Sequence, residues 1–63
     1  MPEPSDVLRA LRHDLSNPLS AILAETQLLL LNEEQLNAET VAGLRQIEAL
    51  SRRMRDMLHA VDI

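Results

Sequence analysis

The sequence predicts an all-α protein, an antiparallel two-helix hairpin that pairs into a homodimeric four-helix bundle. Apolar residues recur at alternating spacings of three and four along two segments, and a polar stretch separates these segments. The chain has 63 residues and no cysteine, so no disulfide can stabilise it. Because a chain this short buries only about 60% of its unfolded surface, small scaffolds without such staples usually associate.

The composition agrees with a helical fold and restricts the class of function. Leucine occurs 13 times and glycine once, whereas Phe, Trp and Tyr are absent. Six arginines and ten acidic residues give a net charge of −4, so the chain lacks the basic surface of nucleic-acid-binding proteins. The longest apolar run covers residues 28–31, far short of the roughly 20 residues that span a bilayer. We expect a cytoplasmic domain without a membrane segment or a targeting leader.

The first helix is expected over residues 6–31. It follows an N-terminal segment, residues 1–4, which its two prolines should keep extended. Ser5 is a suitable N-cap, and Asp6 complements the positive end of the helix. Pro18 lies in register with the apolar repeat of this helix. The stripe that we expect to enter the dimer core comprises Leu8, Leu11, Leu15, Ile22 and Leu29.

A turn is expected over residues 32–37, where polar residues break the repeat, and a second helix over residues 38–61. Either Asn32 or Asn37 could cap this helix. Its contribution to the expected dimer core comprises Leu44, Ile47, Met54, Leu58 and Val61. The hairpin over residues 5–63 would leave its apolar stripe half covered. Two hairpins related by a two-fold axis would bury both stripes, which predicts a homodimer.

His13 lies on the side of the first helix opposite to the apolar stripe. At about 100° per residue, the stripe points within about 20° of the direction opposite His13. We therefore expect an exposed histidine rather than a core histidine with a satisfied hydrogen bond. Asn17 follows one turn later on the same face, and Asp14 lies to the side of it. A plain surface histidine would occupy the same position, so the helical pattern alone assigns no chemistry.

Pro18 sits in the middle of the first expected helix. A proline there removes a backbone hydrogen bond and kinks the helix, at a cost of about 3 kcal/mol. Such a cost beside an exposed histidine indicates that the site uses the distortion. The side chains on the neighbouring surface are small, so another protein could approach this surface closely. They are Ser16, Ser20, Ala21 and Ala24. The alternative is a tolerated kink beside a solvated polar face.

Residues 13–19, His-Asp-Leu-Ser-Asn-Pro-Leu, resemble the H-box of the dimerisation and histidine phosphotransfer domain of sensor histidine kinases. That motif is His, an acid, Leu, any residue, Thr or Asn, Pro and Leu, and every specified position matches. Val7 and Leu11 also fit, although the family often has Phe at the position of Val7. Residues 44–61 resemble the family's X-box through a pattern that is mostly heptad. The resemblance covers residues 5–63 and implies a phosphoacceptor and dimerisation module of a two-component sensor kinase.

The resemblance also implies a role for each residue of the motif. His13 would accept the phosphoryl group of ATP and pass it to an aspartate of a response regulator, because imidazole is largely unprotonated and nucleophilic near neutral pH. Asp14 would be its acid–base partner. Adjacent helical residues do not face each other squarely, so we expect Asp14 to need the kinked geometry or a partner domain. Asn17 would position the water that hydrolyses a regulator's phospho-aspartate, and Pro18 would let the helix bend between kinase and phosphatase states.

Family kinases carry an ATP-binding domain after this hairpin, with Asn-containing and Gly-rich boxes. With one glycine, residues 1–63 offer no cradle for a nucleotide. We therefore expect the chain to bind no cofactor itself, while ATP and Mg²⁺ are held by a separate domain. It would act as a phosphorylation substrate and relay rather than as a self-sufficient kinase. The expected partners are a second copy of the chain, that ATP-binding domain and a response-regulator receiver.

The remaining charged residues give weaker signals. His59 is expected to be solvated on the outer side of the second helix, or to act as a favourable cation near its C-terminus. Arg52, Arg53 and Arg55 fan around the helix, which favours solvated side chains over an anion site. Pairs such as Arg52 with Asp56 fit this reading. No metal site is expected, because the histidines and acids lack metal-ligand spacing.

Two other functions remain open at the level of sequence. A purely structural dimeric coiled coil would explain the heptads, but not the combination of His13, Asn17 and Pro18. A stand-alone histidine phosphotransfer protein usually forms a four-helix bundle within one longer chain, whereas 63 residues supply only two helices. Substitution of His13 separates the signalling reading from the structural one.

Overall fold

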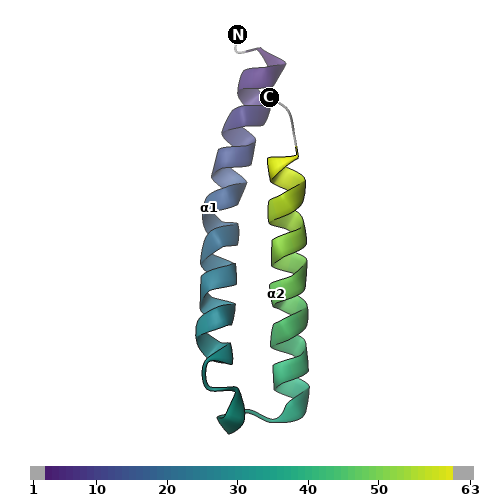
Figure 1. Ribbon diagram of the computed structural model, residues 1–63. Helices are drawn as coiled ribbons and strands as arrows, with labels where there is room; N and C mark the ends of the chain where they lie inside the picture. The colour runs from purple at the N-terminus through teal and green to yellow at the C-terminus, as the bar shows by residue number, and fades with distance from the viewer. Residues whose placement is uncertain (1–2, 61–63) are drawn as a thin grey trace.

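The structure, a computed structural model, describes residues 3–60 as two long helices joined by a tight turn (Figure 1). Helix α1 spans Pro4–Leu30, a short 3-10 helix η1 spans Glu33–Gln35, and helix α2 spans Ala38–His59. The two long helices run antiparallel and side by side, so the start of α1 and the end of α2 lie at the same end of the molecule. No strand occurs within residues 3–60. The predicted all-α hairpin is confirmed.

Helix α1 begins earlier than the sequence suggested. Glu3 is the N-cap residue in an extended conformation, and Pro4 occupies the first helical turn. The amides of Asp6 and Val7 donate to the Glu3 carbonyl at 2.9 and 3.1 Å. A proline suits this position because its fixed φ matches the helix and its missing amide would have no partner there. The predictions of an extended residue 4 and of a Ser5 cap were therefore wrong, and residues 1–2 of the predicted lead lie outside the described residues.

Asn37 is the N-cap residue of helix α2. Its side-chain Oδ1 accepts a hydrogen bond of 2.7 Å from the amide of Thr40, which satisfies one of the free donors at the helix start. An ion pair between Arg45 and Glu33 connects α2 to η1 across the turn. The described part of α2 ends at His59, and Val61, predicted for the dimer core, lies outside the described residues.

The hairpin packs through a seam that differs from the predicted stripe. Its buried members are Leu19, Leu23, Thr26 and Ser51. On α1, these positions continue through half-buried residues at 12, 16 and 30, again at spacings of three and four. Leu44 and Leu58 are half-buried and lie seven residues either side of Ser51, so they belong to this seam and not to the exposed stripe.

The predicted dimer-core stripe lies on the outside of the single hairpin. Its described residues are between 44% and 53% exposed, apart from the two seam leucines, and they are Leu8, Leu11, Leu15, Ile22, Leu29, Ile47 and Met54. Each helix therefore carries two seams, an inner seam of apolar and polar residues and an outer apolar seam, offset by about one position. One seam is used within the chain, whereas the other has no apolar partner among the described residues.

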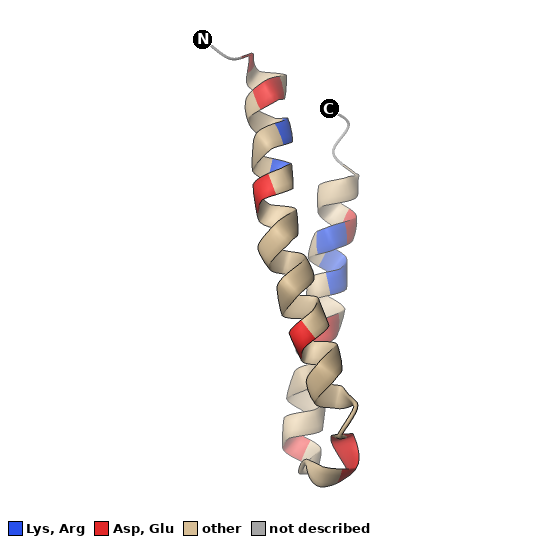
Figure 2. Ribbon diagram, turned by 90° about the vertical axis from the view of Figure 1, so that its left-hand side faces the viewer, with Lys and Arg blue, Asp and Glu red and all other residues tan. Residues whose placement is uncertain are grey.

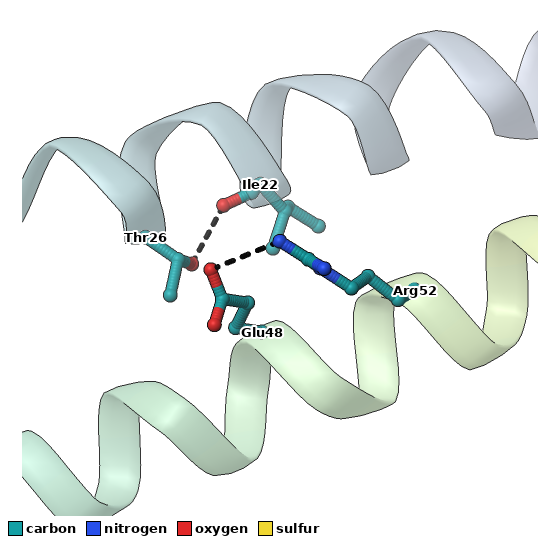
Figure 3. A network of polar contacts seen from close by, with 4 residues as sticks. All are labelled: Ile22, Thr26, Glu48 and Arg52. Carbon is teal, nitrogen blue, oxygen red and sulfur yellow. Dashed lines mark hydrogen bonds and ion pairs between the residues drawn. The ribbon is translucent and has the colours of Figure 1, made fainter. Parts of the chain in front are cut away.

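Polar side chains in and beside the inner seam are paired within their own helices (Figure 3). The Thr26 hydroxyl donates to the carbonyl of Ile22 at 2.7 Å, and Glu48 pairs with Arg52 at 3.5 Å on α2. The predicted pairing of Arg52 with Asp56 was wrong, because Arg52 forms its ion pair with Glu48. Small hydroxyl side chains at such positions let the helices approach without leaving a buried donor unpaired.

Replacing Leu23 by alanine is expected to lower the free energy of unfolding by about 2–3 kcal/mol, because the change removes a buried side chain and leaves a cavity. Leu23 is only 9% exposed in the hairpin. Urea titration followed by circular dichroism at a fixed chain concentration measures this loss. Leu28→Ala is the matched control: Leu28 is 57% exposed, so its change should stay within about 0.5 kcal/mol. Equal losses in the two variants would contradict the packing described above.

Candidate functional site

His13 lies in the N-terminal half of α1 with its imidazole open to solvent. Its side chain is 77% exposed, and so is that of Asp14. The His13 Nδ1 and Asp14 Oδ1 atoms are 3.8 Å apart, which is within ion-pair reach but longer than a hydrogen bond. The carboxylate therefore approaches the imidazole in the hairpin by itself, so the expected requirement for a partner domain is not needed for this approach. With Nδ1 turned to Asp14, Nε2 remains open to an incoming group.

Pro18 is incorporated in α1 without a break in the helix. Since proline has no amide hydrogen, the carbonyl of Asp14 lacks the partner that an i+4 residue would normally supply. Figure 1 shows the N-terminal half of α1 inclined to its C-terminal half, with the change of direction near the middle of the helix. Asn17, the residue before the proline, is exposed and lies one turn beyond His13.

The small surface predicted beside His13 is present in part. Ser20, Ala21 and Ala24 are all exposed on α1. Ser16 differs, because it is half-buried and its hydroxyl donates to the carbonyl of Arg12 at 2.7 Å. It faces the neighbouring helix and does not belong with the other three.

A hollow flanks His13 on the side of α2. It is lined by Arg9, Arg12, His13, Ser16 and His59. His59 was predicted to be solvated, and the sequence did not predict that it would lie beside His13. The spacing of four residues between Arg9 and His13 could have predicted that these two side chains lie on the same face of α1. The approach of His59 depends on how the two helices pair, which no local pattern reports.

An apolar groove crosses both helices on the face where the outer stripe lies. It is lined by Leu15, Pro18, Leu19, Ile22, Ile47, Leu50, Ser51 and Met54. Its walls are almost entirely apolar, and most of its lining side chains are exposed in the hairpin. Leu50 lines this groove although it is not among the residues predicted for the dimer core.

The charge and hydropathy of the described residues limit what else the hairpin can hold. Within residues 3–60, no three histidine or acidic side chains gather closely enough to bind a metal ion. In the same part of the chain, neither helix combines the length and the apolar character that crossing a bilayer requires.

Comparison with known protein families identifies what the chain is similar to. A family model described as the His Kinase A (phospho-acceptor) domain matches residues 5–63, which is nearly the whole chain. Neither a curated protein nor a solved structure matches the chain significantly.

Proposed function

The chain belongs to the His kinase A phospho-acceptor domain family of two-component signalling kinases, and from this premise we propose that His13 is its phosphoacceptor. The observation that carries this proposal is the exposed His13 imidazole with the Asp14 carboxylate 3.8 Å from its Nδ1 atom. His59 is the other histidine of the chain, and it lies outside the motif at the end of α2.

In the proposed reaction, Nε2 of His13 attacks the γ-phosphorus of ATP. A phosphorus–nitrogen bond forms, the bond from the γ-phosphorus to the bridging oxygen breaks, and ADP leaves with the electron pair. Asp14 stabilises the positive charge that develops on the imidazole and takes up its Nδ1 proton, directly or through water. ATP and Mg²⁺ are supplied by a separate ATP-binding domain. A receiver aspartate then attacks the same phosphorus, which returns the bonding pair to the imidazole.

We propose that the working unit is a homodimer in which the apolar grooves of two chains face each other. The radius of gyration is 15.2 Å, against about 11 Å for a compact domain of this length. The chain exposes 5068 Å², whereas a compact monomer of its mass would expose about 4,100 Å². The excess is close to the roughly 800 Å² that one partner contributes to a stable interface. A second copy would supply the missing partner for the outer seam.

The phosphoacceptor proposal is tested by intact-mass spectrometry. The full chain is mixed with ATP, Mg²⁺ and separately expressed kinase ATP-binding domains, and the expected result is an acid-labile gain of one phosphoryl group. Potassium phosphoramidate, which phosphorylates exposed imidazoles chemically, serves as the positive control for detection. No gain with any of several donor domains, in a chain that remains dimeric, would favour a purely structural coiled coil.

Asn17 is proposed to position the water that hydrolyses a receiver's phospho-aspartate, since its amide both donates and accepts hydrogen bonds. Asn17→Ala is expected to slow this hydrolysis by about 10- to 100-fold, because a misplaced water loses its attack geometry. The uptake of phosphoryl by His13 should change less than about twofold, as surface substitutions leave the fold intact. Release of inorganic phosphate from the phosphorylated receiver measures the effect.

Gln27→Ala is the matched control for Asn17→Ala, because it removes an exposed amide from the same helix nearly three turns away. It should leave both reactions unchanged. A phosphatase rate that is equal in the two variants would assign the water-positioning role to another residue.

A further inference from the structure

The hollow beside His13 lies at the end of the hairpin where most of the arginines are found. Residues 3–17 and 51–60 carry five arginines and four acidic residues, whereas residues 18–50 carry one arginine and five glutamates. Figure 2 shows this division, with most of the blue segments toward the free ends of the helices. Five of the six arginines of this acidic chain, and both of its histidines, therefore lie toward one end of the hairpin.

Cationic side chains of both helices converge in the hollow. Arg9 lies one helical turn before His13 and on the same side of α1, and Arg12 immediately precedes it. His59 reaches the hollow from the last turn of α2. Because Ser16 turns its hydroxyl to the Arg12 carbonyl, that small side chain leaves the space between these groups open.

We infer that this hollow receives the phosphoryl group once it is attached to His13, with Arg9 and Arg12 as its principal hydrogen-bond donors and His59 closing the opposite wall. The inference rests on the proposed phosphoacceptor function and adds three positioning residues that lie outside the motif. They act on the transferred group rather than on the nucleophilic nitrogen.

A site of this kind would stabilise the phosphorylated form against the negative charge beside His13. A phosphoryl group carries nearly two negative charges at neutral pH, and Asp14 lies within 3.8 Å of the same imidazole. Guanidinium groups offset this repulsion best, because their planar forks match phosphate oxygens. Arg9 now pairs with Asp6 at 3.4 Å, but both side chains are more than half exposed. Such a surface pair is weak and can yield to a dianion.

Chemical phosphorylation tests the inference without a kinase domain. Potassium phosphoramidate transfers its phosphoryl group to an imidazole nitrogen: its phosphorus–nitrogen bond breaks, ammonia leaves, and a new phosphorus–nitrogen bond forms on His13. A His13→Gln chain treated in parallel identifies any signal from His59. In ¹H–¹⁵N spectra of the full chain, phosphorylation of His13 is expected to shift the Nε–H signals of Arg9 and Arg12, while that of Arg53 stays in place.

A binding titration with inorganic phosphate at constant ionic strength provides the second measurement. The backbone signals of the hollow should respond in the unmodified chain. Arg9→Gln is expected to weaken this binding about fivefold, the typical upper value for one exposed ion pair. Arg53→Gln is the matched control, since it removes the same charge from the same end of the molecule but does not line the hollow. Arg9 is exposed, so its replacement should not disturb the fold.

The outcomes separate this inference from the proposed function. Arginine signals that do not move when His13 is phosphorylated, or equal phosphate affinities in the Arg9 and Arg53 variants, would overturn the inference. Movement of these signals after chemical phosphorylation, combined with no phosphorylation by ATP and any donor domain, would support the hollow as a phosphoryl site and refute the proposed function.

Discussion

The His13→Gln chain is expected to gain no acid-labile phosphoryl group from ATP, while it keeps its helicity and its association. Glutamine retains a polar side chain of similar reach but has no nucleophilic nitrogen lone pair, so the covalent step is lost outright. Because the His13 side chain is 77% exposed, its replacement disturbs no packing. Surface substitutions of this kind change stability by less than about 0.5 kcal/mol. Mass spectrometry, circular dichroism and sedimentation equilibrium on one sample separate lost chemistry from lost structure.

The control for this result is His59→Gln, which removes the other histidine of the chain. It should still show an acid-labile gain, because His59 is not the nucleophile, although the loss of one wall of the hollow is expected to shorten the lifetime of the phosphoryl group. If the phosphoryl gain persisted in the His13 variant and vanished in the His59 variant, the acceptor would be His59. The resemblance of residues 13–19 to the family motif would then not identify the phosphoacceptor.

The hairpin itself was predictable from the sequence because its signals are local. The repeat of apolar residues at spacings of three and four, and the polar stretch after Leu31, are sufficient for two helices and a turn. The N-terminus of α1 was wrong by two residues, since a good cap at Ser5 competed with a proline at Pro4 that suits the first helical turn better. Such boundaries depend on small differences between competing caps.

The assignment of apolar residues to interfaces was harder to predict. Leu19 and Leu23 belong to the inner seam, which was not predicted as a second repeat, because the two repeats on α1 share one period and differ only in phase. The inner seam also contains polar residues such as Thr26 and Ser51, which a hydrophobic pattern does not detect. Packing between the two helices decides which stripe is buried within the hairpin and which stays exposed, and this packing is a property of the tertiary structure.

The candidate site was predictable where it depends on consecutive residues of one helix. The order of His13, Asp14, Asn17 and Pro18 within one motif identified it, and the structure places the first two side chains within 3.8 Å. The cationic hollow was not predictable in the same way, because His59 is 46 positions away from His13 along the sequence. Its contribution depends on the length of the turn and on the antiparallel pairing of α1 with α2.

The second prediction concerns the outer apolar stripe: Ile22→Asp is expected to abolish dimerisation. Ile22 lines the groove that crosses both helices and is 49% exposed in the single hairpin. A two-fold dimer would contain the substitution twice. Loss of about 2 kcal/mol of apolar burial at each copy corresponds to about a thousandfold weaker association. The desolvation of two unpaired carboxylates would weaken it further.

Sedimentation equilibrium should give the mass of a dimer for the unmodified chain and of a monomer for the Ile22 variant. Leu28→Asp is the matched control: it introduces the same charge in place of a branched aliphatic residue on α1. Leu28 is 57% exposed and does not line the groove, so this variant should remain dimeric. If helicity vanishes together with the dimer, folding and association are coupled, as in obligate dimers. An Ile22 variant that stays dimeric would contradict the pairing of the grooves, because an interface centred there cannot accommodate two buried carboxylates without partners.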